Sequence, residues 1–152
     1  MMKEQRKEVR SVLLIDDDPD DFELVAEAMR EVNPAIAVHY TNSCEEVVER
    51  MREPFDLVLL DINMPHHDGF FCLRSIRKYG RQYQPVVMYT NSLSPAHIAR
   101  AYEEGADLYF SKPETFSLLV KGLSDLIGMN WANPRDITKQ FLAKGEYKVF
   151  SA

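Results

Sequence analysis

Three short apolar runs in this chain each end at a charged residue. These runs and the charges that follow them are VLLI before Asp16 and Asp17, LVLL before Asp61, and LYFS before Lys112. Runs of this kind are typical of strands that are buried on both faces of a parallel sheet. Ligands of open α/β sheets bind just outside the carboxyl ends of the strands. We therefore expect these four charged side chains to meet at one edge of such a sheet.

Asp16, Asp17, Asp61 and Lys112 would place several carboxylates around one ammonium group. Carboxylates that lie close together raise one another's pKa values unless a cation lies among them. Carboxylate oxygens are also the ligands that Mg²⁺ prefers. A metal ion and a lysine beside an exposed aspartate are suited to binding a phosphoryl group, so this pattern indicates phosphoryl chemistry.

The length and composition favour one folded domain and argue against several classes of protein. The chain has 152 residues, of which 45% are hydrophobic, and this is enough for one sizeable core. The net charge of −6 does not support a nucleic-acid-binding surface. Residues 1–8 are charged and lack the apolar stretch of a signal peptide, and no run approaches the length of a membrane span. These features predict a cytoplasmic protein that binds neither nucleic acid nor membrane.

The two cysteines, Cys44 and Cys72, lack the spacing of a metal site or of a disulfide framework. Free cysteines behave as small apolar residues and are often buried. We therefore predict two reduced thiols in or near the core, in agreement with a cytoplasmic location.

Strand-like and helix-like patterns alternate along the chain. The strands are predicted at about 11–16, 36–41, 56–60, 85–90 and 107–111. The helices between them are predicted to begin near Pro19, Ser43, Gly69, Pro95 and Glu114. N-caps are expected at Asp18 and Ser43, and helix ends near Gly80, Gly105 and Gly128. Five successive β-α units imply an α/β protein with a parallel sheet, helices on both faces and right-handed crossovers.

Residues 129–152 fall outside this alternation. Pro134 prevents continuation of the fifth helix. A short helix is predicted over 135–143 and a short strand over 147–150. The segment is too short for a second domain, so we expect an extension that packs Trp131 and Phe141 on the body of the protein. A dedicated partner-binding tail is the alternative, and both can hold together.

Four segments carry most of the chemistry, and they are VLLIDDDPDD, LVLLDINMPHHDG, VVMYTNS and LYFSKP. In this order and at this spacing they resemble the CheY-like receiver domain of two-component response regulators. The resemblance covers roughly residues 9–128, with residues 1–8 as a poorly ordered N-terminus and residues 129–152 as the packed extension. It implies a flavodoxin-like (βα)5 fold, a doubly wound parallel sheet with strand order 2-1-3-4-5.

The resemblance implies that Asp61 is a phosphoacceptor. Its phosphoryl group would come from a phosphohistidine of a histidine kinase or of a histidine phosphotransfer protein, as in a phosphorelay. Asp17 matches the family's direct metal ligand, and Asp16 a partner that acts directly or through water. Asp61 and the backbone carbonyl of Asn63 would complete the site for Mg²⁺ or Mn²⁺. Lys112 would pair with a phosphate oxygen as a compact point charge.

Thr90 and Tyr109 match the family's switch residues. Phosphorylation would draw Thr90 toward the phosphoryl group, shift the loop that follows and let Tyr109 turn inward. The face of the fourth helix, fifth strand and fifth helix would then change shape, for output through an unnamed protein partner or a homodimer. Residues expected to serve this output are His97, Arg100, Ala101, Tyr109 and the start of the fifth helix.

Three further positions follow from the same resemblance. Pro65 and Gly69 would shape the loop after Asp61, and the Lys112-Pro113 peptide bond is a candidate for the cis form. Asn91 stands where the family often has a smaller residue, which bears on the lifetime of the phosphate. The extension has no output-domain length, so a DNA-binding output domain is not expected.

Several polar residues near the motifs have simpler explanations. Favourable charges at a helix start explain the aspartates Asp18, Asp20 and Asp21. Asp56 is interpreted as a surface residue at a strand start, and Tyr109 could be an ordinary half-exposed edge residue. His66 and His67 are interpreted as a solvated loop pair that could alter docking with pH.

Two other functions are compatible with parts of this pattern. A haloacid-dehalogenase-like phosphatase would use Asp16 as the nucleophile, but it needs an acidic pair after the lysine, and the only aspartates that follow Lys112 are the isolated Asp125 and Asp136. It would also leave Asp61 without a role. A vestigial receiver would act only as a binding module, although the acceptor, metal and lysine positions are all filled here.

Overall fold

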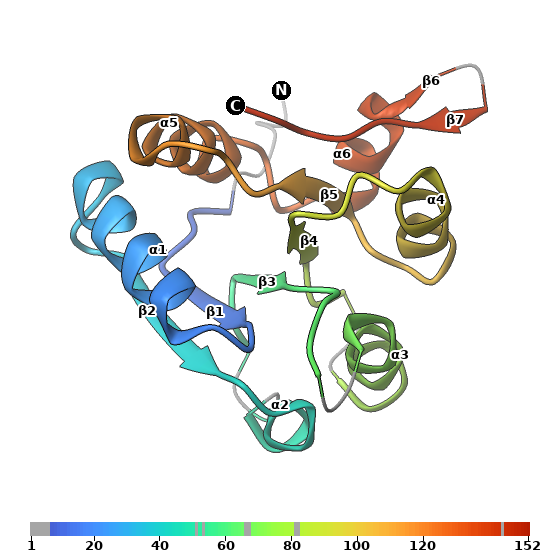
Figure 1. Cartoon of the computed structure of the whole chain (residues 1–152), viewed down its shortest axis with the longest axis horizontal. Helices are drawn as coiled ribbons and strands as arrows, with labels where there is room; N and C mark the ends of the chain where they lie inside the picture. The colour runs from blue at the N-terminus through green and yellow to red at the C-terminus, as the bar shows by residue number, and fades with distance from the viewer. Residues whose placement is uncertain (1–6, 51, 53, 66–67, 81–82, 144) are drawn as a thin grey trace, which may run out of the picture.

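Five parallel strands form the centre of the molecule in the order β2-β1-β3-β4-β5 (Figure 1). The computed structural model describes residues 7–50, 52, 54–65, 68–80, 83–143 and 145–152. The strands are β1 (Ser11–Ile15), β2 (Ala37–Thr41), β3 (Leu57–Leu60), β4 (Val86–Thr90) and β5 (Leu108–Ser111). The helices that alternate with them are α1 (Pro19–Val32), α2 (Cys44–Arg50), α3 (Gly69–Tyr79), α4 (Pro95–Glu103) and α5 (Phe116–Ile127).

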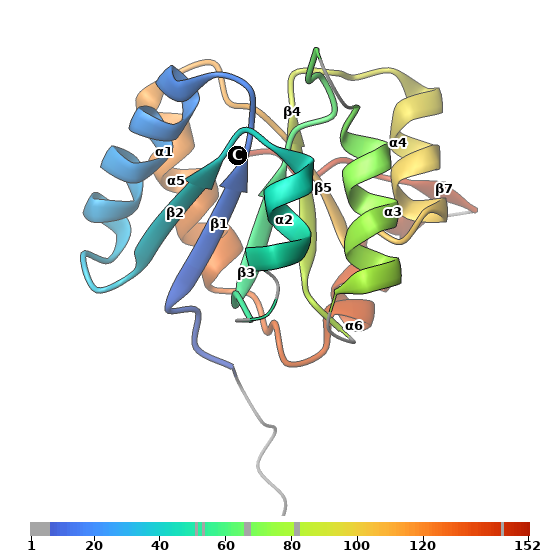
Figure 2. The same cartoon turned by 90° about the horizontal axis from the view of Figure 1, so that it is seen from below.

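Helices cover both faces of the sheet. α1 and α5 pack together on one face, and α2, α3 and α4 lie on the other (Figure 2). All strand pairs of the sheet are parallel. The predicted α/β class, the doubly wound (βα)5 arrangement and the strand order 2-1-3-4-5 are therefore confirmed.

The central strands are apolar throughout because both of their faces are buried. Leu13 and Ile15 of β1 point into the core under α2, α3 and α4, whereas Val12 and Leu14 point into the core under α1 and α5. Successive side chains of a strand alternate between the two faces of a sheet. A strand that is covered on both faces therefore has no position for a polar residue until it leaves the sheet.

The helices begin where the sequence provides side-chain caps. The carboxylate of Asp18 accepts a hydrogen bond from Asp20 N–H at the start of α1, as expected. Ser43 Oγ accepts one from Glu46 N–H at 3.4 Å before α2. The fifth helix begins at Phe116, slightly later than predicted, because the hydroxyl of Thr115 caps it. In the part of the chain that the structure describes, no helix is long and apolar enough to cross a membrane.

The C-terminal region contains α6 (Pro134–Gln140) and a small antiparallel pair, β6 (Leu142–Ala143) and β7 (Glu146–Tyr147). The helix is thus shorter than the predicted 135–143. Trp131 is 1% exposed, and its indole N–H donates to Leu126 O at 2.8 Å. Thr138 of α6 donates to Asp107 O at 2.6 Å. These contacts attach the region to α5 and to the start of β5.

The structure joins Cys44 of α2 to Cys72 of α3 in a disulfide, with the two Cα atoms 5.4 Å apart. The prediction of two reduced thiols is therefore wrong for this structure. The pairing arises because α2 and α3 lie side by side and both side chains belong to the same buried cluster. Sequence spacing alone cannot reveal a contact of this kind between two helices.

Candidate functional site

Asp16, Asp61 and Lys112 meet at the carboxyl edge of the sheet. Ile15 lies opposite Leu60 in the pairing of β1 with β3, so the next residues, Asp16 and Asp61, leave the sheet side by side. Lys112 follows β5, and its Nζ lies 2.9 Å from Asp16 Oδ2 and 3.1 Å from Asp61 Oδ2. The convergence expected from the strand ends is therefore present.

A fourth side chain completes this group. Asp21 Oδ2 lies 2.7 Å from Lys112 Nζ, the shortest of the three carboxylate contacts of the lysine. The sequence interpretation, which treated Asp21 as a charge at the helix start, missed this contact. Asp21 lies in the first turn of α1, which begins at Pro19 after the N-cap Asp18. No local sequence pattern distinguishes it there from Asp20, because the rotation of the helix about its axis decides which of the two faces Lys112.

The group is largely shielded from water. The side chains of Asp16, Asp61 and Lys112 are 1%, 7% and 8% exposed, and that of Asp21 is 25% exposed. Burial raises the pKa of Asp16 to about 6, although hydrogen bonds from Asp18 N–H and Lys112 oppose the shift. Burial alone would lower the pKa of Lys112, but hydrogen bonds to Asp21 and Asp16 raise it above its usual value. Lys112 is therefore charged at neutral pH.

Backbone groups orient the two buried carboxylates. Asp16 Oδ1 accepts from Asp18 N–H at 2.9 Å, and Asp61 Oδ1 accepts from Asn63 N–H at 3.2 Å. The other oxygen of each carboxylate faces Lys112. Each carboxylate is thus held by the backbone on one side and by an ammonium group on the other, which fixes its direction.

The absence of a side chain at Gly69 lets α3 begin against the loop after Asp61. Gly69 N–H donates to Ile62 O at 2.9 Å. A Cβ at position 69 would contact the backbone oxygen of Asp61 and lie 2.7 Å from Ile62 Cα. Because backbone atoms cannot move aside cheaply, this position favours glycine, in agreement with the predicted role in shaping the loop.

The oxygen donors of the predicted metal site lie at this edge. Asp17 is half-buried next to Asp16, and Asn63 is exposed two residues after Asp61. Among the described residues, no three His, Cys, Asp or Glu side chains are grouped to hold a metal ion, and the Asp16 and Asp61 carboxylates instead share Lys112. One ammonium group faces three carboxylates, so the donor set carries surplus negative charge. Such a set fits a divalent cation that prefers oxygen ligands.

Thr90 and Tyr109 lie behind this edge. Thr90 is fully buried, and its Oγ1 accepts from Ser92 N–H at 3.3 Å. Tyr109 is also fully buried, and its hydroxyl donates to Ser92 O at 2.7 Å. The simpler interpretation of Tyr109 as a half-exposed edge residue is therefore wrong. The ring already points inward in this structure.

The structure also describes the other residues to which the sequence assigned a conformation or a role. The Lys112-Pro113 peptide bond is trans, so the expected cis bond is wrong. Ala101 lies on the buried face of α4 in this structure, and its role in output stays a prediction. Asp56 accepts backbone hydrogen bonds at the start of β1, and Asp18 and Asp20 are exposed at the start of α1. His66 and His67 lie outside the described residues.

Two predicted output residues sit at the surface of α4. The Nδ1 atom of His97 lies 2.7 Å from Ser92 Oγ. The guanidinium of Arg100 lies 4.1 Å from the centre of the Phe70 ring. Both side chains are held in place by neighbours, and His97 touches the same loop residue that receives the Tyr109 hydroxyl.

Comparison with known proteins identifies the family. Residues 12–124 match the response regulator receiver domain. The chain therefore belongs to the receiver domain family of two-component response regulators. This membership argues against the phosphatase alternative, which needs an acidic pair after the lysine. The isolated Asp125 instead pairs with Lys121 on α5 at 3.0 Å.

Several curated relatives support this assignment. The rice (Oryza sativa subsp. japonica) two-component response regulator ORR41 is 33% identical over 71% of this chain and 86% of its own length. The sensory/regulatory protein RpfC of Xanthomonas campestris is 30% identical over 80% of this chain. The hybrid signal transduction histidine kinase M of Dictyostelium discoideum is 28% identical over 76% of this chain. The chain spans only 17% of RpfC and 5% of the Dictyostelium kinase.

Solved structures share the fold. The phosphorylated cyanobacterial phytochrome response regulator RcpA superposes with a TM-score of 0.68 at 23% identity, covering 78% of this chain and 91% of RcpA. The Mn²⁺-bound response regulator Rcp1 superposes with a TM-score of 0.65 at 23% identity, covering 77% of this chain and 91% of Rcp1. At these identities the likeness establishes the fold alone.

Proposed function

We propose that this chain is a phosphoryl-accepting receiver, in which Asp61 takes a phosphoryl group from the phosphohistidine of a histidine kinase or phosphotransfer protein. The observation that carries the proposal is the contact of Lys112 Nζ with Asp61 Oδ2 at 3.1 Å and with Asp16 Oδ2 at 2.9 Å. It places the acceptor carboxylate beside a permanent positive charge. Family membership supports the same reaction.

In the proposed reaction, an oxygen of Asp61 forms a bond to phosphorus. The phosphorus–nitrogen bond of the phosphohistidine breaks, and its electron pair returns to the imidazole ring. Catalysis of phosphoryl transfer depends mainly on positioning and on charge stabilisation. The hydrogen bond from Asn63 N–H to Asp61 Oδ1 leaves the other oxygen, the one that faces Lys112, as the nucleophile.

Asp16, Asp17, Asp61 and the backbone carbonyl of Asn63 would hold Mg²⁺ or Mn²⁺. The bound ion would supply positive charge that offsets the charge of the transferring phosphoryl group. The surplus negative charge around Lys112 and the Mn²⁺-bound form of Rcp1 support this assignment. Lys112 would then exchange a carboxylate oxygen for a phosphoryl oxygen, and Thr90 would donate its hydroxyl to another.

We further propose that phosphorylation changes the face formed by α4, β5 and α5, for output through a protein partner in the cytoplasm. Residues 9–128 form the receiver in this proposal, and residues 129–152 form an extension packed on it. The buried chain of contacts from Thr90 through Ser92 to Tyr109 supports a path from the site to that face. A homodimer through this face is one form that the output could take.

Labelling by acetyl phosphate tests the reaction. The chain, incubated with acetyl phosphate and Mg²⁺, should gain one phosphoryl group by intact mass, and Asp61→Asn should gain none. Asp56→Asn is the matched control, because Asp56 also adjoins β3, whereas its carboxylate partners among the described residues are Lys7, Arg10 and Ser11, at or before the start of β1. EDTA should stop the labelling.

Labelling of Asp61→Asn at the rate of the unmodified chain would contradict the proposal and would restore Asp16 as a candidate nucleophile. A chain that is not labelled, and whose tyrosine and tryptophan fluorescence ignores beryllofluoride with Mg²⁺, would instead be a vestigial receiver that acts as a binding module.

A further inference from the structure

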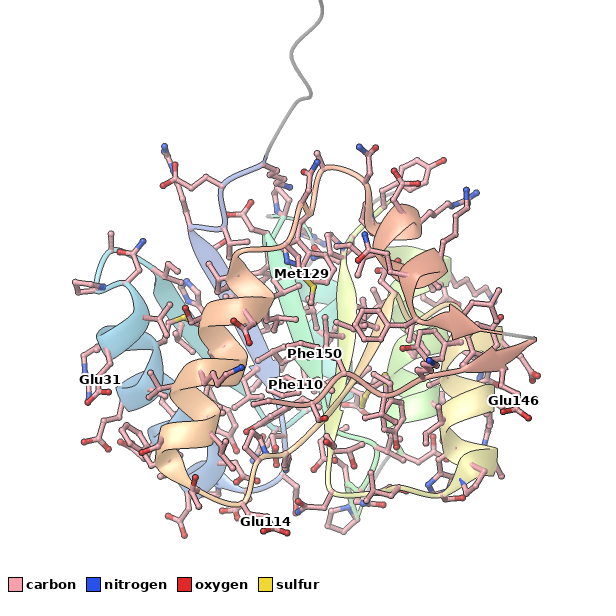
Figure 3. The ribbon with its side chains drawn as sticks, turned by 90° about the horizontal axis from the view of Figure 1, so that it is seen from above. Glu31, Phe110, Glu114, Met129, Glu146 and Phe150 are labelled. Atoms are coloured by element: carbon pink, nitrogen blue, oxygen red, sulfur yellow. A yellow bond between two sulfur atoms is a disulfide. The ribbon has the colours of Figure 1, made fainter. Side chains whose placement is uncertain are left out.

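The last residues of the chain lie along β5, which is an edge of the five-stranded sheet. Phe150 N–H donates to Tyr109 O at 2.7 Å, and Ser111 N–H donates to Phe150 O at 3.3 Å. Phe110 and Phe150 form a parallel bridge and lie next to each other in Figure 3. Residues 146–152, which we call the strap, therefore contact the β5 edge through one isolated bridge at Phe150, whereas Glu146 and Tyr147 pair with β6.

Aromatic side chains fix the strap to the face formed by α4, β5 and α5. Phe150 is 8% exposed, and its ring centre lies 5.0 Å from that of Phe110 and 6.0 Å from that of Phe141. Tyr147 stacks on Tyr102 of α4, with ring centres 4.4 Å apart and planes 9° apart. The strap thus occupies the face that the proposed function assigns to output.

A glycine in the middle of α5 lets the end of the strap approach closely. A Cβ at Gly122 would lie 2.8 Å from Phe110 Cζ and 3.1 Å from Ala152 Cβ. Glycine in a helix interior costs about 1 kcal/mol relative to alanine. The close approach of Phe110 and Ala152 is a packing reason for a residue that helix propensity disfavours.

Hydrogen bonds connect the strap to Thr90 without a gap. Thr90 Oγ1 accepts from Ser92 N–H, and Ser92 O accepts from the Tyr109 hydroxyl at 2.7 Å. Tyr109 N–H then donates to the Tyr102 hydroxyl at 3.0 Å, and that hydroxyl donates to Lys148 O at 2.9 Å. Any movement of Thr90 that displaces Ser92 therefore reaches the backbone of the strap through two tyrosines.

We propose that the strap is an internal ligand of the β5 edge, which competes there with an extended, aromatic-containing peptide of a partner protein and is loosened when Asp61 is phosphorylated. The second part rests on the proposed function. An added strand gains its affinity from backbone hydrogen bonds and its specificity from side-chain pockets. The strap displays both, through the backbone of Tyr109 and Ser111 and through the aromatic contacts of Phe150.

A peptide with the sequence of the strap, Glu-Tyr-Lys-Val-Phe-Ser-Ala, is the probe for the vacant edge. The peptide carries a fluorescent label, and fluorescence anisotropy measures its affinity for the unmodified full chain and for Phe150→Ala. This variant loses the aromatic side chain that holds its own strap on the β5 edge. We expect the variant to bind the probe about tenfold more tightly, because the edge is vacant in a larger fraction of molecules. Lys148→Ala is the control, since Lys148 contributes its backbone carbonyl to the strap contacts, and it should bind like the unmodified chain.

Equal affinity of Phe150→Ala and the unmodified chain for the probe, or no binding by either, would overturn the proposal. If Phe150→Ala dimerises in sedimentation experiments and does not bind the peptide, the β5 edge binds a second copy of the chain. That result would contradict the proposal that a partner protein binds there. Should Phe150→Ala not fold, Tyr102→Phe replaces it, because it removes the hydrogen bond to Lys148 O and leaves the ring in place.

Hydrogen exchange at the amides of Ser111 and Phe150 tests the coupling to Asp61. Beryllofluoride with Mg²⁺ should speed exchange at both amides by about fivefold or more, and Asp61→Asn should not respond. Unchanged exchange in a chain that does take up beryllofluoride would overturn the coupling. A chain that takes up none would contradict the proposed function instead, while the peptide experiment would still decide the role of the strap.

Discussion

Each end of the sheet holds a cation against carboxylate groups, but the charges balance differently at the two ends. At the amino end, Arg77 donates to Asp107, to Gly105 O and to Gln84 O at distances of 2.6–3.0 Å. The single positive charge of Arg77 is therefore paired with a single carboxylate, that of Asp107. At the carboxyl end, Lys112 meets three carboxylates. The first arrangement is balanced in charge, whereas the second carries surplus negative charge.

The partners of the two cations also differ in kind. Guanidinium groups present several donors in a fixed fork, and the Arg77 fork is matched by immobile backbone carbonyls. An ammonium on a flexible stem can exchange one oxygen for another. Burial raises the pKa of Asp107 although Arg77 opposes the shift, so this carboxylate depends on its partner. We infer that Arg77 serves stability and Lys112 serves chemistry.

Among the substitutions that distinguish the two ends of the sheet, removal of Lys112 should have the largest effect, and this effect is on the rate of phosphorylation. Lys112→Met is expected to slow labelling by acetyl phosphate about 100-fold, as for other groups that stabilise charge in a transition state. Arg77→Met should remain within about twofold of the unmodified chain once folded. The initial rate of labelling by intact mass measures both. Equal losses in the two variants would contradict the division of roles.

Removal of Arg77 should show its effect in stability. Arg77→Met leaves Asp107 buried without its ion-pair partner, so the free energy of unfolding in urea should fall by about 3 kcal/mol. Arg74→Met is the control, because Arg74 pairs with Glu104 at the surface and should cost less than about 1 kcal/mol. Mg²⁺ should not restore the Arg77→Met variant. A loss no larger than that of the control would show that the amino end is not a structural anchor.

Asp16 should make its own contribution to the pH dependence of the free energy of unfolding. Its folded-state pKa of about 6 lies above the usual aspartate value, so the folded protein binds more protons between about pH 4 and pH 6. Stability should therefore fall as pH rises through that window, by about 3 kcal/mol from this residue, and stay at the lower level above it. Urea unfolding in EDTA measures the effect, and Asp16→Asn should lack it. The same pH profile for both proteins would refute this assignment.

Asp21 should have the smallest effect. In Asp21→Asn, Lys112 has one carboxylate contact fewer to break when a phosphoryl group arrives. Labelling should therefore speed up by about threefold, which corresponds to a fall of well under 1 kcal/mol in the activation free energy. Asp20→Asn removes the same charge from the same helix turn, but the carboxylate of Asp20 is exposed, so its rate should change less. If both variants accelerate equally, net charge and not the contact with Lys112 is the cause.

The fold and the central part of the site were predictable because they depend on local patterns. Apolar runs specify buried strands, and parallel strands bring their carboxyl ends to one edge. Asp16, Asp61 and Lys112 could therefore be placed together from the sequence. Asp21 was missed because its place depends on the rotation of α1 about its axis, which the helix-start pattern does not fix.

The features that escaped prediction depend on contacts between elements. The disulfide of Cys44 with Cys72 requires two helices to lie side by side. The inward position of Tyr109 depends on Ser92 and on the strap. The strap itself was expected as a short strand, but nothing in its local sequence identifies β5 as the strand that it joins. Such docking is decided by shape and long-range packing.

The pairing of Phe150 with β5 also bears on solubility. An uncovered strand edge presents a row of backbone groups that can recruit other chains, and proteins protect such edges with added segments. In the resting molecule the pairing shields part of this edge. A signalling mechanism that detaches the strap would expose the unpaired backbone groups of β5, which favour aggregation. We expect the form with a detached strap to be short-lived or to bind its partner rapidly.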